Sequence, residues 1–191
     1  MTIAITGGIG SGKSYVCRCL AMRGIRVYDC DEAAKRLMRT SVQLQEKLCR
    51  LVGCQLYRDG LLQKAVLAQF LLSSESSKQA VNDVVHPAVA EDFLASDYEW
   101  FESAILFESG FNRRVHCDYV VCVTAPEETR VQRIMQRDGI SREKALEWIH
   151  RQMSQEEVAR RSDFAVVNDG QADVSGQLDK IFQIIQNKEK K

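Results

Sequence analysis

A glycine-rich segment near the start of the chain constrains the fold more than any other feature. The segment Gly7–Ser14 has the pattern G-x-x-x-x-G-K-S and lies between the apolar run 2–6 and a stretch with helical periodicity. Glycines allow a backbone with positive φ, so successive amides can turn towards one anion, and the following helix directs the positive end of its dipole to the same point. A strand, a loop and a helix in this order predict a phosphate-binding loop.

The residue types in the loop predict that the ligand is a nucleoside triphosphate. Lys13 is expected to reach the β- and γ-phosphates, and the hydroxyl of Ser14 is expected to bind the Mg²⁺ ion between them. A glycine-rich turn followed by a chance Lys-Ser pair is the alternative, but it leaves the flanking strand and helix unexplained. The residues expected to form the nucleotide-binding segment are Gly8, Ile9, Gly10, Ser11, Gly12, Lys13, Ser14 and Tyr15, the side chain of the last pointing away from the phosphates.

Short β-branched runs alternate with helical patterns along the whole chain. This alternation predicts βαβ units around a parallel sheet, with helices on both faces, in an α/β fold of three layers. A last helix is expected over 171–186, where an apolar stripe packs on the sheet, and the charged end 188–191 is expected to fray. Five strands are expected, at residues 2–6, 25–29, 101–107, 119–124 and 164–167.

Two helical segments interrupt this pattern. Residues 32–100 contain no convincing strand and are too long for one crossover, so they are expected to form an inserted helical subdomain. Residues 141–162 are dense in charge and are expected to form a lid that excludes water from bound nucleotide. The core of this single domain is then composed of residues 1–31, 101–140 and 163–191.

Two carboxylates follow the second expected strand. The carboxyl ends of parallel strands face the same crevice as the phosphate-binding loop, so Asp29 and Asp31 are expected to overlook the phosphates. Asp31 is the favoured general base for an acceptor hydroxyl. The alternative is that one of the two aspartates caps the helix that begins near Glu32, and the two roles do not exclude each other.

Three arginines follow the fourth expected strand with helical spacing. Arg130, Arg133 and Arg137 stand at i, i+3 and i+7, which places them on one face of a helix. A solvated basic face is the usual explanation, but phosphoryl transfer needs positive charge against the equatorial oxygens. Arg137, where the helix meets the lid, is expected to be catalytic. The segment Asn-Lys-x-Asp, which a GTPase uses to recognise its base, is missing from the sequence.

Composition excludes several other classes of protein. The 26 Lys+Arg and 26 Asp+Glu residues give a formal net charge of +0, and no basic stripe predicts a nucleic-acid partner. No apolar run approaches the roughly 18 residues that span a bilayer, so no membrane partner is expected. The seven cysteines, without a leader pattern before them, predict reduced thiols in a cytoplasmic protein. We expect a monomer or a weak homo-oligomer.

The assembled motifs resemble those of the dephospho-CoA kinase family, in the nucleoside-monophosphate-kinase group of P-loop NTPases. The resemblance covers nearly the whole chain, and an ordered set of short motifs carries it. Beside the phosphate-binding loop these motifs are Asp29-Cys30-Asp31, Asp59-Gly60, His86-Pro87, Leu106-Phe107-Glu108, Ala125-Pro126-Glu127-Glu128, Arg133 with Gln136-Arg137-Asp138-Gly139, Gln152, and Asn168-x-Gly170.

The resemblance implies ATP-dependent phosphorylation of the ribose 3′-hydroxyl of dephospho-CoA, the last step of coenzyme A synthesis, with Mg²⁺. It implies that the 32–100 segment binds the acceptor with His86 as a contact, that Arg133 binds ATP, and that Asn168 lies near the adenine. An alternative for His86 is a cap-like residue before a helix that starts at Pro87. Other readings are another small-molecule kinase of the group, or an ATP-binding regulator.

The sequence departs from the family pattern at three places. Tyr15 replaces the usual Thr after the loop serine. Around the third expected strand, Glu102 replaces an Asp and Ala104 replaces a Pro. Lys64, the expected acceptor contact after Asp59-Gly60, replaces an Arg; it keeps the charge but cannot make a bidentate contact.

Overall fold

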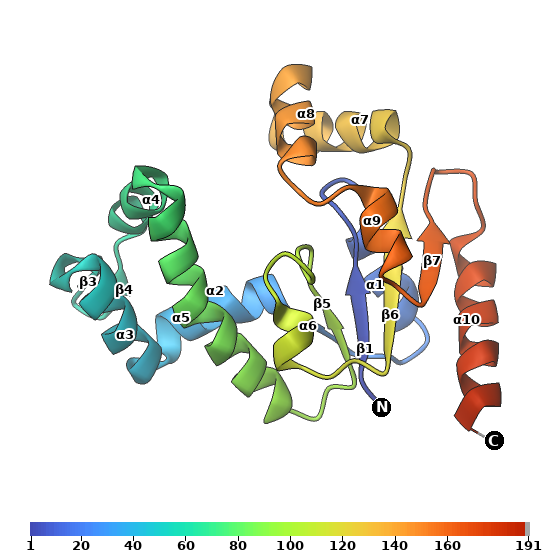
Figure 1. Ribbon diagram of the computed structural model, residues 1–191, viewed down its shortest axis with the longest axis horizontal. Helices are drawn as coiled ribbons and strands as arrows, with labels where there is room; N and C mark the ends of the chain where they lie inside the picture. Colours follow the sequence, from blue (N-terminus) through green and yellow to red (C-terminus); the bar gives the residue numbers. More distant parts are fainter. Residues whose placement is uncertain (190–191) are drawn as a thin grey trace. The chain divides into compact units, whose positions relative to one another are not determined.

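The computed structural model describes residues 1–189 and divides the chain into two compact units (Figure 1). The first unit contains residues 1–28, 98–112 and the chain from 116 onwards. The second contains residues 29–97 and 113–115. Part of the charged end that is expected to fray, residues 190–191, lies outside the described residues.

The first unit is built on a five-stranded sheet with the order β2-β5-β1-β6-β7. The central strand β1 pairs in parallel with β5 and β6, and β6 pairs in parallel with β7. The five-stranded parallel sheet expected from the sequence is therefore confirmed. Its strands are β1 (Ile3–Thr6), β2 (Val27–Asp29), β5 (Trp100–Glu102), β6 (Tyr119–Thr124) and β7 (Phe164–Val167).

Helices cover both faces of the sheet, as the three-layer prediction requires. On one face, α1 (Lys13–Ala21) and α10 (Val174–Glu189) share an apolar core with alternate residues of β1 and β6. The stripe expected on the last helix packs there, with Phe182 partly buried and its other members buried. On the other face, the ring of Phe101 lies 5.3 Å from that of Phe111, and Figure 1 shows α9 (Gln155–Arg160) in front of β6. The stripe consists of Val174, Leu178, Ile181, Phe182 and Ile185.

Three strands are shorter than expected, β1 by one residue and β5 and β2 by more. The chain leaves the sheet after β5, because the amide of Ser103 still bonds to Ile5 while the amide of Ser109 turns back to Ile105. Leu106 is fully buried in this turn. The periodicity of such a short apolar run does not distinguish a buried strand from another buried conformation, which is why the strand was predicted too long. At the second strand, Ile25 bonds back to Leu20 and belongs to the turn before β2.

Three helices follow β6, and the first two enclose a small second core. They are α7 (Glu127–Asp138), α8 (Arg142–His150) and α9. Gly139 ends α7 with φ of 65°, and Ser141 caps α8 by accepting from the amide of Lys144. The core between α7 and α8 also receives the side chain of Ile9 from the phosphate-binding loop. Within residues 1–189, no helix is both long and apolar enough to cross a membrane.

The second unit is mainly helical. Leucines from three of its helices and from a short 3-10 helix are buried in it, and the Tyr57 hydroxyl donates to the Met38 carbonyl at 2.8 Å. Its elements are α2 (Cys30–Thr40), α3 (Val42–Val52), η1 (Cys54–Leu56), β3 (Tyr57–Arg58), β4 (Leu61–Leu62), α4 (Lys64–Ser73) and α5 (Glu75–Leu94).

Two expectations for this segment are wrong. It does contain strands, because β3 and β4 form a hairpin around Asp59 and Gly60, which both have positive φ. Asp-Gly is a strong signal for such a turn. In addition, no helix starts at Pro87, since α5 runs through it. Proline removes one hydrogen bond inside a helix, but buried residues on both sides, such as Val85 and Val89, hold α5 together.

Candidate active site

The phosphate-binding loop has the backbone that its glycines predict. It leaves the buried strand β1 and turns through Gly7, Gly10 and Gly12, with φ of 140°, 79° and 92°. The amide of Ser11 donates to the carbonyl of Gly8 at 3.1 Å and closes the turn. Among the described residues, several amides of the loop and of the first turn of α1 have no hydrogen bond within the protein, and these are available to an anion. They include the amides of Gly10, Gly12, Lys13 and Ser14.

Side chains from two other elements hold the carbonyls on the outside of the loop. Arg130 Nε donates to the Ile9 carbonyl at 2.9 Å. Arg133 donates to the carbonyls of Gly10 and Ser11 at 3.3 and 3.2 Å, and Asn168 Nδ2 donates to that of Ser11 at 3.1 Å. In a trans peptide the next N–H points opposite to the carbonyl. These donors therefore direct two of the free amides, those of Gly10 and Gly12, towards the inside of the loop.

Position 12 requires a glycine because of its positive φ and also because neighbouring side chains leave no room for a Cβ. A Cβ placed on it would collide with Nδ2 of Asn168 and lie 3.3 Å from a guanidinium nitrogen of Arg133. The backbone amide of Asn168 in turn bonds to Thr124 at 2.8 Å, so the ends of β6 and β7 fix its position. The structure thus places Arg133 and Asn168 against the loop backbone.

Lys13 is held at the base of the loop. Its Nζ donates to the carbonyl of Gly7 at 2.8 Å and lies 3.6 Å from Oε1 of Glu102, at the end of β5. Both side chains are largely buried, with exposed fractions of 12% and 15%. The glutamate that departs from the family pattern is therefore the ion-pair partner of Lys13.

The metal ligand expected in this unit is the Ser14 hydroxyl, and its environment fits Mg²⁺. Ser14 is exposed at the first turn of α1, and Mg²⁺ is commonly held by one or two protein oxygens, substrate phosphates and water. Within residues 1–189 no cluster of three or more His, Cys, Asp or Glu residues forms a separate metal site. Tyr15 is half exposed, with the guanidinium of Arg18 5.8 Å from its ring centre.

The three arginines of α7 do not behave alike. Arg130 and Arg133 contact the loop, whereas Arg137 forms hydrogen bonds to the carboxylate of Asp138, which raise the pKa of the arginine. The side chain of Arg137 is 61% exposed. The sequence predicted no separate role for Arg130. Its spacing from Arg133, which places both on one helical face, is the signal that could have indicated its contact with the loop.

The remaining expected residues belong to the second unit. Asp29 is the cap of α2, because its carboxylate accepts from the amide of Glu32 at 2.9 Å, and Asp31 is exposed in the first turn. Burial lowers the pKa of His86, and Arg114 lowers it further, while Asp83 and Asp31 oppose the shift. Lys64 is exposed at the start of α4.

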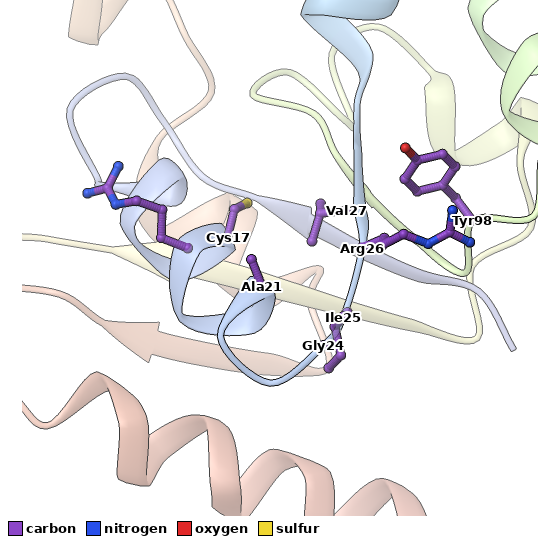
Figure 2. A pocket seen from close by; sticks show the side chains of 8 residues that line it. Cys17, Ala21, Gly24, Ile25, Arg26, Val27 and Tyr98 are labelled. Atoms are coloured by element: carbon purple, nitrogen blue, oxygen red, sulfur yellow. The ribbon is translucent and has the colours of Figure 1, made fainter.

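A separate cavity of about 490 Å³ lies beside the C-terminal half of α1 (Figure 2). Cys17, Ala21 and Val27 contribute to its wall, and the guanidinium of Arg26 lies 4.9 Å from the ring centre of Tyr98. None of the described residues that line it was predicted to take part in catalysis or binding. The candidate active site of this unit is therefore the phosphate-binding loop.

Comparisons with known proteins identify the family of the chain. A family model described as dephospho-CoA kinase matches residues 1–173. The chain is 39% identical to a dephospho-CoA kinase of Bacteroides fragilis over 193 residues, which cover 97% of this chain and 93% of the relative. It is 43% identical to a dephospho-CoA kinase of Porphyromonas gingivalis over 175 residues, covering 88% of this chain and 86% of that protein.

Solved structures show the same fold. The crystal structure of a Thermus thermophilus protein superposes with a TM-score of 0.80 at 33% identity and covers 96% of both chains. A dephospho-CoA kinase from Campylobacter jejuni superposes with a TM-score of 0.68 at 22% identity and covers 98% of both chains. On the family match and these relatives, the chain belongs to the dephospho-CoA kinase family.

Proposed function

We propose that the protein transfers the γ-phosphoryl group of ATP to the ribose 3′-hydroxyl of dephospho-CoA, giving coenzyme A and ADP. One observation carries this proposal: a complete phosphate-binding loop, with free amides and Lys13, in a chain that a dephospho-CoA kinase model matches over residues 1–173. The reaction completes coenzyme A synthesis, and we place it in the cytoplasm.

The proposed roles follow the chemistry of phosphoryl transfer. The free loop amides and Lys13 bind the β- and γ-phosphates. Asp31 accepts the proton of the ribose 3′-hydroxyl while the hydroxyl oxygen attacks the γ-phosphorus and ADP leaves. Arg137 supplies positive charge to the equatorial oxygens. Ser14 would hold Mg²⁺, which neutralises charge between the phosphates when bound.

The wider organisation is part of the same proposal. Residues 32–100 bind the acceptor, with Lys64 and His86 as contacts, and residues 141–162 form the lid. Arg133 and Asn168 belong to the nucleotide site through the loop carbonyls that they hold. The protein acts as a monomer or a weak homo-oligomer, without a nucleic-acid or membrane partner.

The direct test measures ADP formation from ATP and Mg²⁺ with and without dephospho-CoA, and then locates the new phosphate by mass spectrometry. We expect ADP formation that depends on dephospho-CoA, and a product phosphorylated at the 3′-position. A faster reaction with another hydroxyl or phosphate acceptor from a panel would identify a different kinase of the group. No transfer to any acceptor, with ATP still bound, would identify a regulator.

Two variants assign the roles within that assay. Lys13→Ala should lower turnover by at least about 100-fold while thermal unfolding stays near that of the wild type. Asp31→Asn should lower transfer by about 10²–10⁴-fold and leave the ATP dissociation constant near that of the wild type. Equal turnover in either variant would remove that residue from the mechanism.

A further inference from the structure

Both backbone polar groups of Ile9, in the phosphate-binding loop, are held by side chains. Its N–H donates to Oε1 of Gln152 at 2.7 Å, and its carbonyl accepts from Nε of Arg130 at 2.9 Å. The two partners are 143 and 121 residues away in sequence. Gln152 lies in the 141–162 segment and Arg130 lies on α7, so the backbone of Ile9 links the loop to two other parts of the first unit.

The backbone that carries Gln152 is itself fixed. Its amide bonds to the carbonyl of Ile149 at 3.2 Å at the end of α8, and the next amide, of Met153, donates to Oε1 of Glu108 at 3.0 Å. The side chain of Ile9 packs into the same α7–α8 core that buries Ile149. Ile9 is therefore anchored to this segment through its side chain as well as through its backbone N–H.

The glycines of the loop leave room for both partners. A Cβ on Gly8 would collide with the guanidinium of Arg130 and lie 3.2 Å from Oε1 of Gln152. A Cβ on Gly10 would lie 2.7 Å from the backbone carbonyl oxygen of Arg130. Because Gly8, unlike Gly10, has no positive φ, this close approach is the reason that the structure gives for a glycine at position 8.

These two bonds fix two successive peptide groups of the loop: Gln152 holds the Gly8–Ile9 peptide group and Arg130 holds the Ile9–Gly10 peptide group. In the second, the trans geometry fixes the N–H of Gly10 opposite to the Ile9 carbonyl, and this amide is one of the free ones. We infer that Gln152 is a positioning residue: by holding the Gly8–Ile9 peptide group beside the one that Arg130 holds, it helps to present the Gly10 amide to phosphate and couples the 141–162 segment to the loop. The inference rests on the proposed function, because it requires that the loop binds ATP.

The test compares two glutamines that hold backbone amides with the same chemistry. Gln155 Oε1 accepts from the amide of Ala125 at 2.9 Å, so it ties the same segment to the end of β6 without touching the loop. Gln152 and Gln155 are both half-buried. Gln152→Leu and Gln155→Leu therefore remove equivalent hydrogen bonds, only one of which reaches Ile9.

The readouts are ATP binding by calorimetry, without acceptor, and amide hydrogen exchange of Ile9 followed by NMR. Gln152→Leu should weaken ATP binding at least about fivefold and speed exchange at Ile9 by a similar factor, since the amide loses its only acceptor among the described residues. Gln155→Leu should change neither quantity more than about twofold. Since coupling is reciprocal, ATP should also slow exchange across Arg142–Arg160 in the wild type, and less so in Gln152→Leu.

Unchanged ATP affinity and unchanged Ile9 exchange in Gln152→Leu would overturn the inference, as would equal effects of the two leucine variants. Should Gln152→Leu fail to fold, Gln152→Asn keeps the carboxamide but withdraws it by one methylene, and it should show the same changes at smaller size. A wild-type protein that does not bind ATP would instead contradict the proposed function. The two failures are thus distinguishable.

Discussion

Gly12 and Gly24 share a left-handed backbone but differ in what surrounds them. Their φ values are 92° and 78°. A Cβ at Gly12 meets Asn168, whereas a Cβ at Gly24 meets nothing within 4 Å. The pair therefore separates backbone strain from steric collision inside the phosphate-binding loop.

We predict that Gly12→Ala loses ATP binding by at least about 100-fold, because Asn168 must leave the Ser11 carbonyl or the loop must shift. Gly24→Ala should bind ATP like the wild type and lose only about 1 kcal/mol of unfolding free energy, the cost of left-handed strain. Calorimetry and urea unfolding measure the two quantities. ATP binding retained by Gly12→Ala would show that the loop tolerates displacement of Asn168.

Single residues were predictable from sequence only where their role is local. The loop glycines and Lys13 form one short pattern, so their placement follows from that pattern alone. The roles of Arg130 and Gln152 depend on contacts across more than 100 residues, which no local period encodes. The spacing of Arg137 placed it on the right helix, but its pairing with Asp138 depends on local geometry at the end of α7.

Among the elements, α5 places a titratable residue in the middle of a long helix. His86 stands next to Pro87. Its charge state is influenced by Asp83 of the same helix, by Asp31 of α2 and by Arg114 of a short helix after β5. The pKa of His86 lies below its ordinary value of 6.5 mainly because the residue is partly buried, and secondly because Arg114 is near. The two aspartates oppose this shift. The native state therefore favours the neutral imidazole.

This shift predicts the sign of a pH effect on stability. The pKa of His86 is lower in the folded state than in the unfolded state. As pH falls below 6.5, the unfolded state therefore binds more protons than the folded state. The stability that is present above pH 6.5 is then lost as pH falls towards the folded-state pKa. Urea unfolding at about pH 7.5 and about pH 5.5 should show a larger loss of unfolding free energy for the wild type than for His86→Gln. An equal loss in both proteins would mean that other groups carry the acid sensitivity.

The elements differ in how well the sequence specified them. The bounds of β6 and β7 agree with the prediction because both are continuous buried runs that end at polar residues. The strand at Trp100–Glu102 was predicted too long, because the buried turn around Leu106 is as apolar as a strand. The hairpin of β3 and β4 was missed since two-residue strands show no period, although Asp59-Gly60 marks its turn.

At the scale of the whole molecule, the chain forms two compact units, and the proposed ligands are assigned to different ones. The phosphate-binding loop, which we propose binds ATP, lies in the first unit, and the expected acceptor contacts Lys64 and His86 lie in the second. A ligand that binds only the native state stabilises it by about 2.7 kcal/mol when its concentration is 100 times its dissociation constant. That stabilisation is strongest where the ligand makes its contacts, because proteins open locally as well as globally.

Hydrogen exchange followed by mass spectrometry can therefore test the two assignments separately. We predict that ATP with Mg²⁺ slows exchange in the first unit, in the loop and from α7 to α9, and that dephospho-CoA alone slows exchange in α4 and α5, which carry Lys64 and His86. Lys13→Ala is the matched control: it should lose the ATP effect in the first unit and keep the dephospho-CoA effect in the second. Protection by dephospho-CoA confined to the first unit, in either protein, would contradict acceptor binding by residues 32–100 while leaving the ATP site unaffected.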